Sequence, residues 1–143
     1  MLFNLLVLLH VISAAGWFGL ALAIGGMARR AAAGGGPPVL EEGSKTIMLM
    51  NVFIVAAFVL GLLAFFLGGG FSAYGPQYHT SLSLVAILIA IQFFVIRPAW
   101  SSLASEGPAA QSARKRISMG TGIGHLLWLI VLVLMFWNHY PLA

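Results

Sequence analysis

The charged side chains of this sequence are confined to two short segments, residues 29–45 and 97–116. The remaining stretches, residues 1–28, 46–96 and 117–143, contain no Asp, Glu, Lys or Arg. A helix needs about 20 mostly apolar residues to cross the hydrocarbon core of a bilayer. The outer two stretches can each cross once, and the middle stretch can cross twice, with a glycine-rich break near residues 68–77. The pattern predicts an all-α, polytopic membrane protein with four spans.

Composition and charge limit the class of protein further. Charged residues make up 7% of the chain, against about a quarter in soluble domains. Four spans and two loops use the whole chain, so we expect a single membrane domain, residues 1–143, in the inner (plasma) membrane. The net charge of +4 lies beside the spans, where it attracts anionic lipid. The expected partner is therefore the lipid bilayer and not a nucleic acid, and the absence of cysteine excludes disulfides and thiolate metal sites.

The basic residues also predict how the spans are oriented. We expect spans at residues 2–27, 46–67, 79–96 and 118–137, with Arg97-Pro98 ending the third. Loops 28–45 and 97–117 carry all the Lys and Arg, so the positive-inside rule places them in the cytoplasm and both termini on the outer (periplasmic) side. Short connections favour an antiparallel four-transmembrane-helix bundle.

Small residues recur at helical spacing in three of the spans. Such stripes let helix backbones approach closely in lipid. We expect them to mark packing within the chain, and a subunit interface is the alternative. The stripes are Ala15, Gly19 and Ala23 in the first span, Ser83, Ala86 and Ala90 in the third, and Gly120 and Gly124 in the fourth.

Polar residues within the spans fall into two layers. The inner layer is Asn51, Gln92 and His125, which lie at similar distances from the cytoplasmic ends of their spans. A polar side chain in hydrocarbon usually faces the bundle interior and finds a partner there. We expect an interhelical hydrogen-bond cluster at this level, and a polar ligand pocket is the alternative.

The outer layer contains His10, the histidine deepest in apolar surroundings at this level. Because His10 and Trp17 share a helix face, they would face the same neighbours. One interpretation is a neutral imidazole bonded to a serine or a carbonyl oxygen. The other makes His10 an axial haem or metal ligand, with His79 or His139 opposite. The candidate cofactor-binding residues are then His10, His79, His139, Trp17 and Ser83, and the candidate metal ligands are His10 and His79.

Methionines offer a weaker metal hypothesis. Thioethers are soft ligands suited to Cu(I), although methionine also fills gaps in apolar cores. Four of them lie at the cytoplasmic ends of spans: Met27, Met48, Met50 and Met119.

Two segments resemble those of a known group of membrane proteins. Residues 10–19, HVISAAGWFG, resemble the first span of the four-helix CopD/HemJ group. Residues 79–85, HTSLSLV, are similar to the HemJ pattern His-x-Lys-Leu-x-Leu-Val, with Ser81 at the lysine position. A basic stretch before the last span, residues 114–116, is also shared. The resemblance to HemJ implies haem b at His10, and the resemblance to CopD implies copper handling.

These observations leave two classes of function. No carboxylate lies within a span, and no nucleophile–base pair or phosphate-binding motif is present, so we predict no catalytic residues and favour a non-enzyme. We favour an accessory or structural subunit of a membrane complex, for instance a redox complex, or a homo-oligomer. The alternative is a haem b- or copper-binding membrane protein of the CopD/HemJ type, with His10 as its buried ligand.

Overall fold

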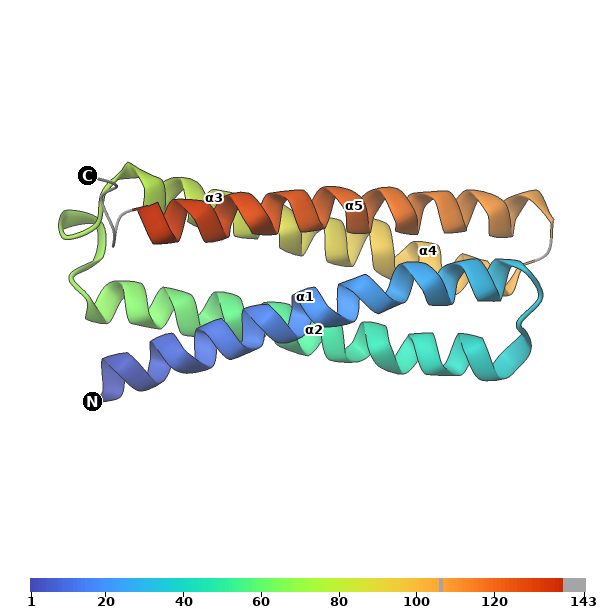
Figure 1. Ribbon diagram of the computed structural model, residues 1–143, viewed down its shortest axis with the longest axis horizontal. Helices are drawn as coiled ribbons and strands as arrows, with labels where there is room; N and C mark the ends of the chain where they lie inside the picture. The colour runs from blue at the N-terminus through green and yellow to red at the C-terminus, as the bar shows by residue number, and fades with distance from the viewer. Residues whose placement is uncertain (106, 138–143) are drawn as a thin grey trace.

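The computed structural model describes residues 1–105 and 107–137, and every regular element in them is helical. The long helices are α1 (Leu2–Ala32), α2 (Gly36–Leu67), α3 (Pro76–Ile91) and α5 (Pro108–Trp137). A π turn (Gln92–Ile96) joins α3 to the short helix α4 (Arg97–Ser101), and 3-10 turns follow α2 (Gly70–Ser72) and α4 (Ser102–Ala104). The protein thus has four helical rods long and apolar enough to cross a membrane, lying side by side (Figure 1).

The helices continue well beyond the spans predicted from the sequence. Most of loop 28–45 is helical, and only residues 33–35 separate α1 from α2. Arg29 and Arg30 occupy the last turn of α1, where cations interact favourably with the helix dipole. Prolines lie in the first turn of α2, where their missing N–H groups are not needed. Loss of hydropathy therefore marks where a span leaves lipid, and the helix itself continues further.

The third rod, Pro76–Ala104, consists of α3, the π turn, α4 and the 3-10 turn that follows it. It continues through Arg97-Pro98, where the sequence predicted its end. The π turn supplies the physical reason. The N–H of Arg97 bonds to the carbonyl oxygen of Gln92, five residues earlier, instead of four. Pro98, which has no N–H to donate, then falls in the first turn of α4. The rod passes the proline and buries Trp100 two residues later.

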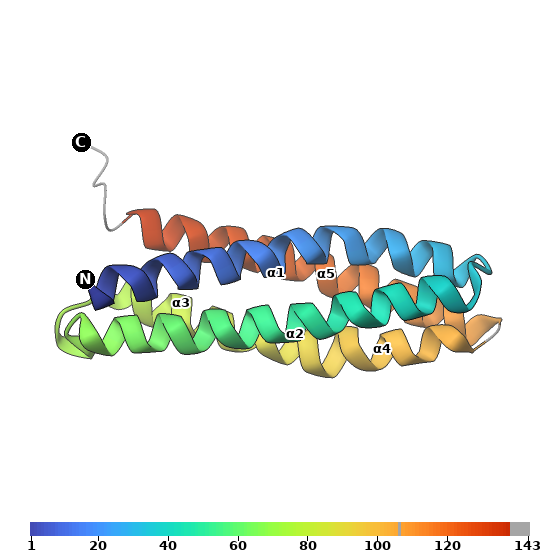
Figure 2. The same cartoon turned by 90° about the horizontal axis from the view of Figure 1, so that it is seen from below.

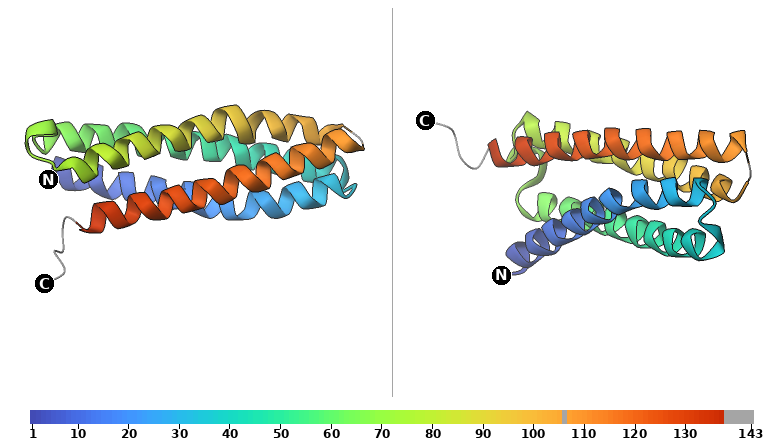
Figure 3. Two further views of the ribbon diagram at one scale, coloured as in Figure 1. Left: turned by 90° about the horizontal axis from the view of Figure 1, so that it is seen from above. Right: turned by 45° about the vertical axis from the view of Figure 1, so that its right-hand side comes forward.

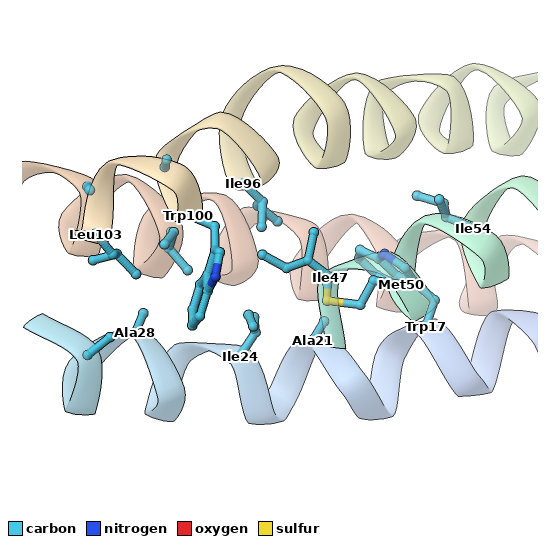
Figure 4. Close-up of a cluster of buried hydrophobic side chains, with 14 of the residues drawn as sticks. Trp17, Ala21, Ile24, Ala28, Ile47, Met50, Ile54, Ile96, Trp100 and Leu103 are labelled. Atoms are coloured by element: carbon cyan, nitrogen blue, oxygen red, sulfur yellow. The ribbon is translucent and has the colours of Figure 1, made fainter. Parts of the chain in front are cut away.

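Packing is uneven along the bundle. We call the end with residues 29–45 and 97–116 the charged end and the opposite end, where α2 stops and α3 begins, the uncharged end. Helix α1 runs alongside α2 and packs mainly on it (Figure 2). Helix α5 packs on both α3 and α1, whereas α2 and α3 make few contacts. The buried core lies in the half toward the charged end, where Trp17, Met50 and Ile96 point toward one another (Figure 4). Toward the uncharged end, α1 and α2 diverge from α3 and α5 (Figure 3).

The small-residue stripes have different surroundings. A Cβ added at Gly124 would lie 3.2 Å from the Trp17 ring, and one at Gly120 would lie 3.2 Å from Ile96. These two glycines therefore serve packing within the chain, as expected. In contrast, Gly19 has no neighbouring atom within 4 Å of an added Cβ, and the other members of the first-span and third-span stripes are exposed. For those two stripes, the expectation of packing within the chain was wrong.

Trp100 fixes the close approach of α4 to α2 at the charged end. Its indole N–H donates to the Leu40 carbonyl oxygen at 3.3 Å and the Ser44 hydroxyl oxygen at 3.1 Å. The six-membered ring lies directly on the backbone of Gly43, where any Cβ would overlap it. A glycine is therefore required at this position.

We expect Gly43→Ala to lower the free energy of unfolding by about 1–3 kcal/mol, because the tryptophan must move from its site. The measurement is reversible unfolding in mixed detergent micelles, followed by circular dichroism. Gly25→Ala is the matched control, since an added Cβ there meets no atom within 4 Å. Equal stability of the two variants would contradict this account.

Candidate functional site

A cavity of about 620 Å³ lies between the diverging rods at the uncharged end. This volume falls within the roughly 300–1,000 Å³ typical of small-molecule sites. Its walls are mostly aliphatic and aromatic side chains, and the side chains with polar atoms include His10, Tyr74 and Tyr78. The cavity exists because α2 and α3 make few contacts and the bulky core residues lie elsewhere.

Among the described residues that line the cavity, His10 is the one predicted as a ligand. Its Nδ1 lies 2.6 Å from the carbonyl oxygen of Ala57 on α2. A carbonyl oxygen only accepts hydrogen bonds, so Nδ1 carries the proton. In the neutral tautomer that has its proton on Nδ1, Nε2 keeps its lone pair. The carbonyl-bonded imidazole considered from the sequence is therefore present. It is also the arrangement that metal-binding histidines adopt, because a bond from the other ring nitrogen fixes tautomer and orientation.

Small residues of α2 make room for the His10 ring. A Cβ added at Gly61 would lie 2.8 Å from both Cε1 and Nδ1 of His10, so the imidazole rests on the glycine backbone. Ala57, Gly61 and Ala64 all line the cavity and follow one another at helical spacing. The sequence analysis missed this stripe, although the spacing that identified stripes in the other spans is present here too.

The structure does not place His79 or Ser83 on the cavity with His10. The His79 ring packs against Phe71, with ring centroids 5.1 Å apart, and against Phe65 at 6.2 Å. Its buried Nε2 has no hydrogen-bond partner among the described residues. Ser83 is exposed, and its hydroxyl donates to the His79 carbonyl oxygen at 3.1 Å. His139 lies outside the described residues.

Asn51 and Gln92 of the inner polar layer belong to one hydrogen-bonded chain, but its third member is Trp17 and not the expected His125. Gln92, fully buried at the start of the π turn, donates through Nε2 to Asn51 Oδ1 at 2.8 Å. Its Oε1 accepts from the Trp17 indole N–H at 3.3 Å. Trp17, expected beside a cofactor, thus joins α1 to this chain. His125 instead packs edge-on against Phe18, with ring centroids 5.0 Å apart.

The four methionines do not share one environment. Met50 is buried in the core, whereas Met48 and Met119 are exposed. Met27 Sδ accepts a hydrogen bond from the Thr46 hydroxyl at 3.7 Å. Within the described residues, no group of three or more His, Asp or Glu side chains is arranged to hold a metal ion.

The chain matches no protein-family profile, no curated protein and no solved structure. Its resemblance to the CopD/HemJ group stays a prediction carried by residues 10–19 and 79–85. The residues that line the cavity are therefore the basis for assigning its chemistry.

We expect Trp17→Phe to destabilise the bundle by about 1 kcal/mol, because it leaves the buried Gln92 Oε1 without a donor. In a double-mutant cycle, the loss of unfolding free energy caused by Trp17→Phe should be smaller by about 0.6 kcal/mol or more when Gln92→Leu is already present. Unfolding in mixed micelles measures both. Trp128→Phe is the control, since the Trp128 indole N–H has no partner among the described residues. Strict additivity would show that the hydrogen bond is not formed.

Proposed function

We propose that this protein binds an apolar, planar cofactor in the cavity at the uncharged end, with His10 as its ligand. The observation that carries the proposal is the Nδ1–carbonyl bond of His10, which leaves the lone pair of Nε2 for a metal. Of the cofactors considered from the sequence, b-type haem fits best, because histidine is a common ligand of haem iron and the porphyrin ring is apolar.

The residues around His10 fit this cofactor in three respects. The walls are apolar, the volume is that of a small-molecule site, and Gly61 leaves room for the His10 ring beside α2. Ala57 would fix the ring orientation of His10, and the aromatic walls would exclude water from the iron. When bound, haem b supplies one-electron redox chemistry. Copper is the other candidate, since Met135 brings a soft sulfur to the same cavity.

We also propose that the rods cross the inner (plasma) membrane as an antiparallel four-helix bundle with both termini outside. The cationic side chains all belong to the segments at the charged end, which the positive-inside rule assigns to the cytoplasm. The cavity then lies in the outer half of the bilayer.

The protein purified in mild detergent from cells supplied with a haem precursor should show a Soret band and about one haem per chain. We expect His10→Ala to abolish the Soret band. Gly61→Ala should weaken haem affinity about 10–100-fold, because the added methyl displaces the imidazole. Absorption spectra and pyridine haemochrome assays measure this, with metal analysis for copper.

Gly19→Ala is the matched control for Gly61→Ala, because an added Cβ meets no atom within 4 Å there. It should bind haem as the unmodified protein does. A colourless, copper-free protein, or a His10→Ala variant with an unchanged spectrum, would refute the proposal.

One observation favours a second function, that of an accessory or structural subunit or a homo-oligomer. Ala15, Gly19 and Ala23 form a stripe of small residues on α1 that is exposed. In lipid, such a stripe allows a second helix to approach closely. This role is compatible with a cofactor in the cavity, which lies on the other side of the α1 backbone from Gly19.

Because the chain has no cysteine, single-cysteine variants can test this second role. We expect Gly19→Cys to form intermolecular disulfides in native membranes under mild oxidation, either between copies or with a cysteine-bearing partner. Val55→Cys, on an exposed face of α2, is the control. Equal cross-linking of both variants, seen on non-reducing gels, would indicate random collision.

A further inference from the structure

We infer that α5 carries a binding site for one anionic phospholipid at the charged end of the bundle. The site is a shallow hollow lined by Gln111, Ser112, Arg114, Lys115 and Ser118. All five residues are exposed, and no carboxylate is among them. Two cations, two hydroxyls and an amide form a set of donors suited to a phosphodiester group.

The hollow lies at the depth of lipid headgroups. The charge-free part of α5 runs from Ile117 to Trp137, which at 1.5 Å per residue matches the roughly 30 Å hydrocarbon core. Arg114 and Lys115 precede it by less than one turn, so their side chains reach the phosphate layer of the leaflet at this end. Neither forms an ion pair with another described residue.

Ser112 and Ser118 differ from the other Ser and Thr residues of the long helices, whose hydroxyls donate to a carbonyl oxygen of their own helix. Hydroxyls such as those of Ser13, Ser81 and Thr121 donate to the carbonyl oxygen four residues earlier in their own helix. The Ser118 hydroxyl makes no hydrogen bond within the described part of the chain. It therefore has a donor free at the border between the cationic side chains and the apolar surface.

An apolar strip continues from the hollow along the same face of α5. Residues three or four positions apart share a helix face, and steps of four, four, three and four residues from Ser118 lead to Gly122, Leu126, Leu129 and Val133, all exposed. Gly122 has no side chain, and no atom lies within 4 Å of a Cβ added there. The helix surface next to the headgroup site is therefore open. A cationic hollow joined to an apolar strip matches the outline of a lipid with its acyl chain lying along the helix.

The test is thermal unfolding of the purified protein in detergent, titrated with dioleoyl-phosphatidylglycerol or, separately, dioleoyl-phosphatidylcholine. We expect phosphatidylglycerol to raise the Tm saturably and phosphatidylcholine to leave it unchanged. The double variant Arg114→Gln/Lys115→Gln should bind phosphatidylglycerol about 30-fold more weakly.

Arg29→Gln/Arg30→Gln is the matched control, because it removes two exposed cations from the same end but from α1. It should keep the lipid-dependent rise in Tm. If both double variants lost the phosphatidylglycerol-dependent rise in Tm equally, the lipid would be attracted diffusely to the charged end, and the proposal of a site on α5 would be overturned. An equal rise in Tm with phosphatidylcholine would show that the negative charge of the lipid is not recognised. An equal rise in Tm with inorganic phosphate would show that a lipid is not needed.

Discussion

A polar group inside a bilayer has to find its partner within the protein, because hydrocarbon offers none. In this chain the requirement is met in two ways. Most intramembrane hydroxyls bond to their own helix, as Ser81 does with the carbonyl oxygen of Gln77. The long-range bonds are fewer, and they tie different helices together. They include those from Trp17 to Gln92, from Gln92 to Asn51, and from His10 to the backbone of Ala57. Only the last of these opens onto a cavity, and this is why we propose His10 as the ligand.

The positions of the rods could be predicted from the sequence, since a charge-free stretch of sufficient length indicates a span. The ends of the helices could not. Arg29 and Arg30 continue α1 because a helix tolerates cations in its last turn, and Pro98 is accommodated because a π turn shifts the hydrogen bonding before it. Hydropathy reports the surroundings of a residue, whereas helix ends depend on backbone hydrogen bonds. The end of an apolar span and the end of its helix coincide only where glycines interrupt the chain, as after Leu67.

The candidate site was predictable to the extent that side chains define it. His10 was identified because an imidazole in an apolar stretch needs a partner, but that partner is a backbone carbonyl, which leaves no trace in the sequence. Asn51 and Gln92 were correctly grouped by depth, since residues at one level on neighbouring helices can meet. Depth alone could not place His125, whose rotation about α5 directs it to Phe18, or show that Trp17 donates to Gln92.

The two ends of the bundle depend on each other. The hydrogen-bonded chain and the core around Trp17 and Met50 hold α1, α2 and the third rod in register near the middle of the bundle, and the core continues from there toward the charged end. Because that half is closely packed, the other half can stay apart without the helices slipping. The small residues Ala57 and Gly61 then keep one wall of the gap low enough for the His10 ring. Bulky side chains at these two positions would fill the space that the histidine faces, so the cavity depends as much on residues that lack side chains as on those that line it.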